Sequence, residues 1–496
     1  MIKDNKIMIG KAGEKEVSLY PSQLNRHGLI AGATGTGKTV TLKVIAESLS
    51  EMGVPTVIAD VKGDLTGMIV PGDHEAIEGR LSSMGIEDYE VRRYPVRFYD
   101  VFQKRGHPIR VVLQDMDPIL ISRILDLTDV QKGILNIIFR IAKDMELDIV
   151  DLKDLQAMAA YVGEHNKEYT LRYGNITKQS VGAIQRKLLE LESEGGDIFF
   201  GMEDLDIADW LTADDKGMGI MNMIECEELY HHPLLYSTFL YWMLEELYRR
   251  LPEVGDLEKP KVVFFFDEAH LLFDSASKQL LEKIEQTVRL IRSKGVGIFF
   301  ISQSPADIPN SVLSQLSNRI QHSLRAYTPS EIKAARMAAQ SFRENPDIDA
   351  AELISNMETG TALVSVLQED GSPSIVEKTK ILPPRSSMKV ASEDRLLYAV
   401  EASELYGKYE RVFDPESAYE TLDDMRQEEE KAKKEAEEEK ARQAEQAKKE
   451  KEAKAEAKRR QNLSDKLARK TINKLQNELI NTGFRQAKKF LKTLLK

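Results

Sequence analysis

Cysteine is almost absent from this sequence, because its 496 residues include only Cys226. A single cysteine excludes an internal disulfide framework and a cysteine-rich zinc site, and it fits a protein of a reducing cytosol. Long apolar runs are also missing, since no stretch reaches the roughly 18 apolar residues that span a bilayer. The segment 1–17 carries charges where a secretion signal needs an apolar stretch. These absences predict a cytoplasmic protein with no membrane span.

Charge is distributed unevenly along the chain, whose formal net charge is −12. Residues 421–460 contain 13 acidic and 13 basic side chains, and residues 461–496 contain nine basic and two acidic ones. Residues 1–420 therefore carry a net charge of about −19, which excludes a uniformly basic nucleic-acid coat. At roughly 100–200 residues per domain, the length predicts two to four domains with a large buried core.

The C-terminal part of the chain has a composition of its own. Residues 428–460 are almost entirely Glu, Lys, Ala, Gln and Arg, which predicts a solvated single helix acting as a spacer, with disorder as the alternative. Apolar positions at coiled-coil spacing are lacking there. Residues 461–496 place leucines among lysines at near-helical spacing, which predicts one or two basic amphipathic helices broken near Gly483. Such helices can dock on their own body or a neighbouring subunit, or contact nucleic acid or a membrane surface.

The first 385 residues follow an α/β pattern. Four apolar runs, near residues 28–32, 55–60, 261–270 and 295–304, predict buried strands of a parallel sheet covered on both faces. The stretch from Asp117 to Arg250 has helical patterns instead. The predicted segments are a short N-terminal segment (1–27), the first part of the core (28–116), a helical insertion (117–250), the second part of the core (251–385), a helical connector (386–427), the charged spacer (428–460) and the basic amphipathic helices (461–496).

A phosphate-binding loop is the sharpest motif. The run Gly32, Ala33, Thr34, Gly35, Thr36, Gly37, Lys38 and Thr39 matches G-x-x-x-x-G-K-[ST], between an apolar strand and an amphipathic helix. Glycines let the backbone wrap close to phosphate oxygens, and the helix N-terminus adds partial positive charge. Lys38 is expected to reach the β- and γ-phosphates of ATP, and the Thr39 hydroxyl is expected to bind Mg²⁺.

A pair of carboxylates supplies the second part of this predicted site. Asp267 and Glu268 end the apolar strand of the sequence Lys-Val-Val-Phe-Phe-Phe. A P-loop ATPase needs a carboxylate near the metal and a residue that orients the attacking water. Asp267 fits the first role, through Mg²⁺ or its water, and Glu268 fits the second.

The strand near 295–304 ends in a polar tip, Ser302-Gln303. Gln303 can sense the γ-phosphate and position water, although polar strand ends are common.

Hydrolysis also gains from an arginine that neutralises transition-state charge, and the candidates are Arg289, Arg292, Arg319 and Arg325. Arg292 precedes the strand, at the end opposite Gln303, so it is expected to reach a neighbouring subunit's nucleotide; a surface arginine at a helix end is the alternative.

The turn after the second strand carries further charges. Asp60, Lys62 and Asp64 can contact the nucleotide site, a pore or a partner. A turn stabilised by Asp and Gly explains them equally well. His270 can couple to the carboxylate pair or pack at a helix start.

These motifs in this order resemble the HerA/FtsK-type P-loop ATPases, most closely a bacterial HerA-like helicase family of unknown function. The resemblance rests on residues 29–68, 262–273 and 288–329 and extends over most of the first 385 residues. It implies a RecA-like core, a homo-hexameric ring with ATP and Mg²⁺ between subunits, and double-stranded DNA in the central channel. It also implies that Glu268 is the catalytic glutamate, Gln303 the sensor and Arg292 the finger.

The resemblance has one departure. Archaeal HerA looks to have a β-barrel before its ATPase core, whereas only 27 residues precede the phosphate-loop strand here, which leaves open any contact that such a barrel makes with a nuclease partner.

The sequence therefore predicts a ring-forming ATPase that translocates on or unwinds double-stranded DNA. Two alternatives remain open: a motor for protein transport or assembly, and a nucleotide-gated scaffold. No nuclease motif is visible, so any strand cutting would come from a partner.

Overall fold

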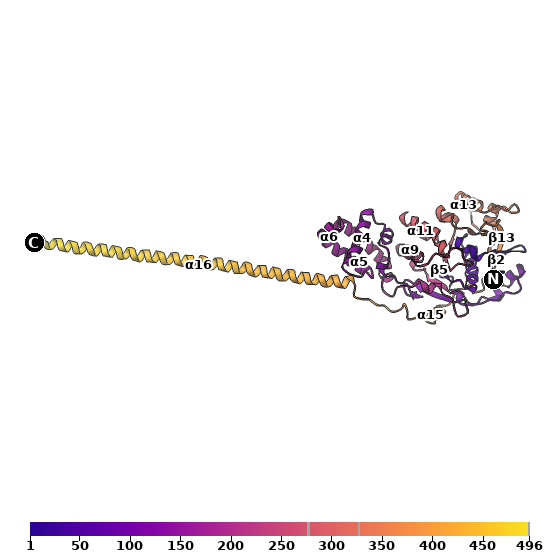
Figure 1. Cartoon of the computed structure of the whole chain (residues 1–496), viewed down its shortest axis with the longest axis horizontal. Coiled ribbons are helices and arrows are strands. Elements are labelled where there is room, and N and C mark those ends of the chain that lie inside the picture. Colours follow the sequence, from indigo (N-terminus) through magenta and orange to yellow (C-terminus); the bar gives the residue numbers. More distant parts are fainter. Residues whose placement is uncertain (275–277, 326–327, 495–496) are drawn as a thin grey trace. The chain divides into compact units, whose positions relative to one another are not determined.

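The computed structural model describes residues 1–274, 278–325 and 328–494. The chain forms two compact units, Met1–Glu420 and Thr421–Lys496. The first unit is a mixed α/β body built on one sheet, and the described residues of the second belong to one helix (Figure 1).

A single 13-stranded sheet organises the first unit, in the order β1-β2-β13-β12-β11-β4-β10-β9-β5-β8-β6-β7, with β3 paired to β2. The strands are β1 (Ile2–Lys3), β2 (Lys6–Ala12), β3 (Lys15–Leu19), β4 (Gly28–Ala31), β5 (Thr56–Asp60), β6 (Val96–Asp100), β7 (His107–Pro108), β8 (Met221–Glu225), β9 (Val262–Phe266), β10 (Val296–Ser302), β11 (Asn318–His322), β12 (Thr361–Ser365) and β13 (Glu377–Ile381). The strands from β11 to β7 in this order run parallel, and the remaining pairs are antiparallel.

The four apolar runs of the sequence form β4, β5, β9 and β10, as predicted. They are neighbours in the order β4-β10-β9-β5. Because neighbouring parallel strands point the same way, their carboxyl ends meet at one edge of the sheet. The residues that follow all four strands therefore lie at this edge, which we call the carboxyl edge.

Helices cover both faces of this central part of the sheet. Alternate residues of a strand point to opposite faces. Phe265 of β9 belongs to a core cluster with Leu42 and Ile45 of α1 (Lys38–Glu51). On the other face, Phe300 of β10 contacts Phe273 of α10 (His270–Asp274). Such two-sided burial explains why the strands read as continuous apolar runs.

The other helices of the first unit are short or medium in length. They are α2 (His74–Ser83), α3 (Pro118–Ile124), α4 (Asp129–Asp144), α5 (Leu152–Glu164), α6 (Asn166–Tyr173), α7 (Lys178–Leu191), α8 (Asp197–Phe199), α9 (Pro233–Arg250), α10 (His270–Asp274), α11 (Lys278–Ile291), α12 (Asn310–Leu313), α13 (Pro329–Gln340), α14 (Ala350–Asn356) and α15 (Glu393–Glu401). Helices α3, α4, α5 and α7 pack on one another, and α4, α5 and α6 form a helical group at one side of the sheet body (Figure 1).

The segment 117–250 is not wholly helical, contrary to the prediction from the sequence. It contains β8, which lies between β5 and β6 in the central sheet. The β8 sequence Met-Asn-Met-Ile-Glu contains one β-branched residue, Ile224. Its strand conformation comes from pairing with distant segments rather than from local propensity.

The structure adds detail to one predicted segment and departs from another. Residues 1–27 form β1, β2 and β3, which extend the sheet through β13. The predicted helical connector 386–427 contains α15, but residues 402–417 are irregular.

The described residues of the second unit, 421–494, lie in one continuous helix, α16 (Ala418–Leu494). The predicted break near Gly483 is wrong, because the helix continues through this residue. An interior glycine costs only about 1 kcal/mol, and strong helix formers follow it closely, as in the run Arg-Gln-Ala-Lys-Lys at 485–489. Ion pairs spaced four residues apart run along the helix, as between Glu450 and Lys454. Among the described residues, no helix is long and apolar enough to cross a membrane.

Candidate active site

The phosphate loop connects β4 to α1 at the carboxyl edge. Gly32, Gly35 and Gly37 have φ angles of 155°, 78° and 118°, which L side chains rarely adopt. A Cβ on Gly37 would also lie 3.2 Å from the Cα of Gly360. The loop therefore needs glycine for its backbone angles and, at Gly37, for a close contact.

Lys38 begins α1 and folds back over the loop. Its Nζ donates to the carbonyl oxygens of Gly32 at 2.7 Å and Ala33 at 3.3 Å. Burial lowers the pKa of Lys38, and the nearby Lys62 ammonium lowers it further, while Glu268 and Asp267 act in the opposite direction. The ammonium group thus lies against the loop backbone, which in a P-loop surrounds the phosphates of the nucleotide.

Residues that the sequence did not single out support the loop from behind. His322, at the end of β11, places its Nε2 2.8 Å from Thr41 Oγ1 of α1, and burial lowers its pKa to about 4. The carbonyl of Thr36 accepts a hydrogen bond from Gly360 at 2.9 Å. Neither contact could be predicted from the sequence around His322 or Gly360, because their partners lie about 280 and 320 residues away.

The charged residues of the turn after β5 have two roles: one stabilises the turn, and the other two contact residues of the site. The carboxylate of Asp60 accepts hydrogen bonds from the backbone of Lys62 at 3.2 Å, Gly63 at 2.9 Å and Leu65 at 3.0 Å, so Asp60 stabilises the turn. The other two side chains reach the site. Thr39 Oγ1 donates to Asp64 Oδ2 at 3.3 Å, and Lys62 pairs with Glu268.

Asp267 and Glu268 follow β9, next to the phosphate loop. Both residues are 5% exposed. Burial raises the pKa of Asp267 to about 6; Lys62 opposes this rise and Glu268 adds to it. Burial also favours the neutral form of Glu268, but the hydrogen bond and charge of Lys62 hold its pKa below the ordinary value.

Three side chains converge on the carboxylate of Glu268. Lys62 Nζ contacts Oε1, Gln303 Nε2 donates to Oε2 at 3.5 Å, and His270 Nδ1 lies 3.3 Å from Oε2. The φ angle of Glu268 is 47°, an uncommon value for a non-glycine residue that often marks functional sites. The structure thus brings Lys38, Glu268 and Gln303 to the carboxyl edge.

Arg292 lies apart from this group. It begins the 3₁₀ turn Arg292–Lys294, before β10, whereas Gln303 follows β10. The seven residues of that strand separate the two by roughly 20 Å. The Arg292 side chain is 40% exposed and lies 4.0 Å from Asp256, so within one chain it does not reach the phosphate loop.

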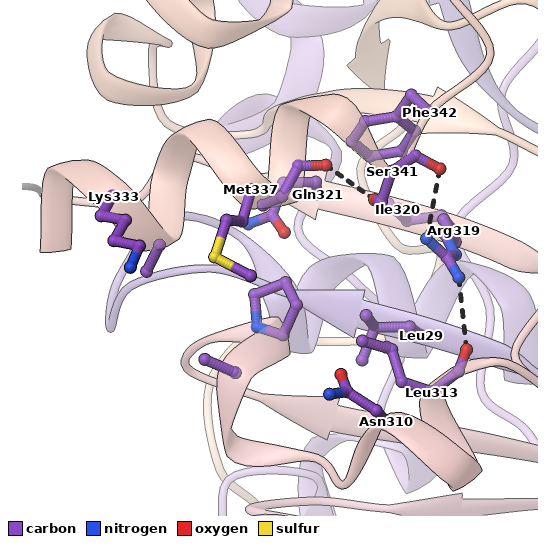
Figure 2. A pocket seen from close by; sticks show the side chains of 14 residues that line it. Leu29, Asn310, Leu313, Arg319, Ile320, Gln321, Lys333, Met337, Ser341 and Phe342 are labelled. Carbon is purple, nitrogen blue, oxygen red and sulfur yellow. Dashed lines mark hydrogen bonds between the residues drawn. The ribbon is translucent and has the colours of Figure 1, made fainter. Parts of the chain in front are cut away.

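Arg319, another candidate, lines a separate apolar pocket of about 480 Å³ between β11 and α13 (Figure 2). Its guanidinium donates to the carbonyl oxygens of Leu313, Leu316 and Ser341. These contacts hold loop backbone together, which is a structural role. Arg325 is exposed and follows β11 at the carboxyl edge.

Comparison with known proteins places this chain in a family. The model of the family "Helicase HerA-like C-terminal" matches residues 5–495, nearly the whole chain. The chain belongs to this family. Its HerA-like P-loop carries Lys38 and Thr39, and its acid pair is Asp267 and Glu268.

Relatives of this HerA-like chain include archaeal proteins. It is 21% identical over 365 residues to the DNA double-strand break repair helicase HerA of Sulfolobus acidocaldarius, covering 72% of this chain and 65% of that protein. It is 24% identical to the protein of the same name from Saccharolobus solfataricus, covering 73% and 66%. The chain thus spans about two thirds of the length of these relatives or slightly less.

Solved structures show the same fold. The bacterial conjugative coupling protein TrwB, in an unbound form, matches with a TM-score of 0.52 and 16% identity, covering 79% of this chain and 92% of TrwB. TrwB in complex with a non-hydrolysable ATP analogue gives a TM-score of 0.51 at 16% identity, covering 79% and 93%. The HerA-like chain therefore has a RecA-like P-loop core with a mainly parallel sheet.

Proposed function

We propose that this HerA-like chain hydrolyses ATP and uses the energy to translocate on double-stranded DNA as a ring-shaped homo-hexamer, with DNA unwinding as one outcome. The observation that carries the proposal is the meeting of the phosphate loop, the acid pair and Gln303 at the carboxyl edge of four adjacent parallel strands. Family membership and the names of the archaeal relatives support the DNA substrate.

ATP would bind with its phosphates over residues 32–39. The backbone N–H groups of the loop and the N-terminus of α1 offer donors and partial positive charge to the phosphates. Lys38 adds a full charge facing the β- and γ-phosphates. Loop and lysine together orient the γ-phosphate toward Glu268.

The residues around Thr39 fit Mg²⁺. Oδ1 of Asp64 is buried and has no hydrogen-bond partner among the described residues, while Oδ2 accepts from the Thr39 hydroxyl. Burial raises the pKa of Asp267, and the negative charges of Glu268 and Asp64 raise it further, so a cation among these carboxylates would relieve their repulsion. Thr39 and Asp267 would hold the ion, directly or through water. Bound Mg²⁺ supplies charge neutralisation at the phosphates.

Hydrolysis would then use Glu268 as the base. It accepts a proton from a water molecule whose oxygen forms a bond to the γ-phosphorus, while the bond from that phosphorus to the β–γ bridging oxygen breaks. ADP and inorganic phosphate are the products. Gln303, which donates to Glu268, would sense the γ-phosphate and hold the water, and Arg292 of a neighbouring subunit would neutralise transition-state charge.

The test is the ATPase rate against duplex DNA concentration at low and moderate salt, with Glu268→Gln as the control. Stimulation that weakens with salt and vanishes in the variant supports a DNA-coupled motor. A flat response with hydrolysis still dependent on Glu268 overturns the DNA assignment and favours a protein-transport or assembly motor. Slow turnover without stimulation, together with a Glu268→Gln protein that still functions, favours the nucleotide-gated scaffold.

A further inference from the structure

Lys62 is placed at the site by its backbone. The Asp60 carboxylate holds the turn through three backbone N–H groups, and Gly63 takes a φ angle of 65° that favours glycine. The turn therefore keeps its shape without help from the Lys62 side chain. Its long side chain extends from the end of β5 to Glu268, 206 residues further along the chain.

The pair that Lys62 forms is asymmetric in exposure. The side chain of Glu268 is 7% exposed and that of Lys62 is 37% exposed. The Lys62 ammonium keeps part of its water, whereas the Glu268 carboxylate has lost most of its own and must be paired. Lys62 supplies this buried carboxylate with positive charge and a hydrogen bond. The contact therefore affects the protonation and the orientation of Glu268 directly.

The Glu268 carboxylate is exposed to the positive charge of both Lys62 and Lys38. Burial favours the neutral form of Glu268, but the hydrogen bond from Lys62 and the charges of both lysines hold its pKa below the ordinary value. Lys38 Nζ itself lies against the phosphate loop, where it donates to the carbonyl oxygens of Gly32 and Ala33. An anion between two cations is favoured electrostatically, and Lys38 belongs to a motif that binds the β- and γ-phosphates. A γ-phosphate at this place would compete with Glu268 for Lys62.

We propose that Lys62 is a positioning residue that exchanges its partner: it orients the Glu268 carboxylate and then binds the γ-phosphate of ATP, which frees Oε1 of Glu268 to accept the proton of water. This proposal rests on the proposed ATPase function. It does not depend on DNA being the substrate. In this proposal, the turn Asp60–Asp64 carries the lysine that binds the γ-phosphate, and this binding releases Glu268 to act as the base.

The proposal predicts different effects on ATP and ADP, because only ATP carries the γ-phosphate. In the full chain, Lys62→Met keeps the apolar stem and removes the charge. Its Kd for ADP should stay within about twofold, whereas its Kd for a non-hydrolysable ATP analogue should rise about ten- to a hundredfold. Its kcat should fall about a hundredfold, the cost of a misplaced reacting group.

Two further variants complete the test. Lys62→Arg keeps the charge and should restore part of kcat and of the analogue affinity. Lys408→Met removes a lysine that pairs with Asp209 at 2.7 Å with comparable exposure, and it should match the unmodified protein in every measurement.

The outcomes separate this inference from the proposed function. Equal weakening of ADP and analogue binding, or a Lys62→Met protein with unchanged kcat, overturns the role of Lys62 while the ATPase assignment stands. If the unmodified protein binds the analogue but does not hydrolyse ATP, the proposed function fails, and the ratio of the two Kd values still decides whether Lys62 contacts the γ-phosphate.

Discussion

Two lysine–glutamate pairs show how differently the two units use the same chemistry. Lys62 and Glu268 meet at the carboxyl edge, where the glutamate side chain is 7% exposed. Lys454 and Glu450 lie 3.7 Å apart on α16, where both side chains are at least 75% exposed. The first pair sets the protonation and direction of one buried carboxylate, whereas the second is one of several equivalent contacts with water on all sides.

The difference follows from the cost of burying charge. A buried carboxylate must be paired or hydrogen-bonded, because losing water is expensive. This explains why Asp60 collects three backbone donors and why Glu268 is contacted by Lys62, Gln303 and His270. On α16 water solvates each charge, so no single residue is essential. Single substitutions should therefore be severe at the edge and mild on the helix.

The largest effect is expected for Lys38→Ala. Removing the ammonium group that caps the phosphate loop takes away the charge facing the β- and γ-phosphates, so ATP binding should be lost and turnover should fall to background. Equilibrium binding of a fluorescent ATP analogue and steady-state hydrolysis measure this. Unchanged turnover would show that the nucleotide binds elsewhere.

Glu268→Gln should lower kcat by about 10²–10⁴-fold, the usual contribution of a general base, while ATP binding persists. The amide cannot take a proton from water, but it keeps nearly the same shape. Single-turnover hydrolysis with saturating ATP measures the effect. The matched control is Glu253→Gln, at an exposed carboxylate, which should hydrolyse ATP normally; a similar loss in both would argue against a specific role for Glu268.

Local sequence patterns were sufficient for part of this structure. The strands β4, β5, β9 and β10 each correspond to one apolar run, and the phosphate loop is a contiguous motif. Their alignment at one edge followed from parallel pairing alone. Sequence reasoning also placed Arg292 and Gln303 at opposite ends of β10, as the structure has them.

Features that depend on distant partners were not predictable in this way. Strand β8 is defined by pairing with β5 and β6, although only one of its five residues, Ile224, is β-branched. The partner of Lys62 is 206 residues away, and the support of the loop by His322 and Gly360 joins segments about 280 and 320 residues apart. The wrong prediction at Gly483 has another cause: the cost of a single interior glycine, about 1 kcal/mol, is too small to end a helix that continues into the helix-forming run 485–489.

Arg292→Ala should lower turnover by about 10²–10³-fold if its charge acts across a subunit boundary, with assembly and ATP binding retained. Mixing it with Lys38→Ala subunits should restore activity, since these supply an intact Arg292 to intact phosphate loops. Hydrolysis across a titration of mixing ratios measures this. Arg186→Ala, at an exposed position of α7, is the control; activity that simply adds in the mixtures would favour a role within one chain.

Substitutions of apolar residues should also affect the two units differently, through the free energy of unfolding. Phe265→Ala removes a fully buried ring between β9 and α1 and should lower the free energy of unfolding of the first unit by about 3–5 kcal/mol. Leu475→Ala, at a side chain 54% exposed on α16, should change it by less than about 0.5 kcal/mol. Chemical denaturation followed by tryptophan fluorescence compares the two; a large loss in Leu475→Ala would reveal that this face is covered in solution.

The smallest effect is expected for Glu450→Gln on α16. It removes one i,i+4 pair, which is worth about 0.3–0.5 kcal/mol and is screened by salt. The helical signal in circular dichroism should therefore fall slightly at low salt, and the difference should vanish near 1 M salt. Glu268→Gln breaks a pair of the same chemical type, yet its effect on turnover should persist at high salt, because the buried carboxylate is shielded from ions. A salt-sensitive defect at Glu268 would place that carboxylate in a solvated environment like that of the helix, and the distinction between the two pairs would then be lost.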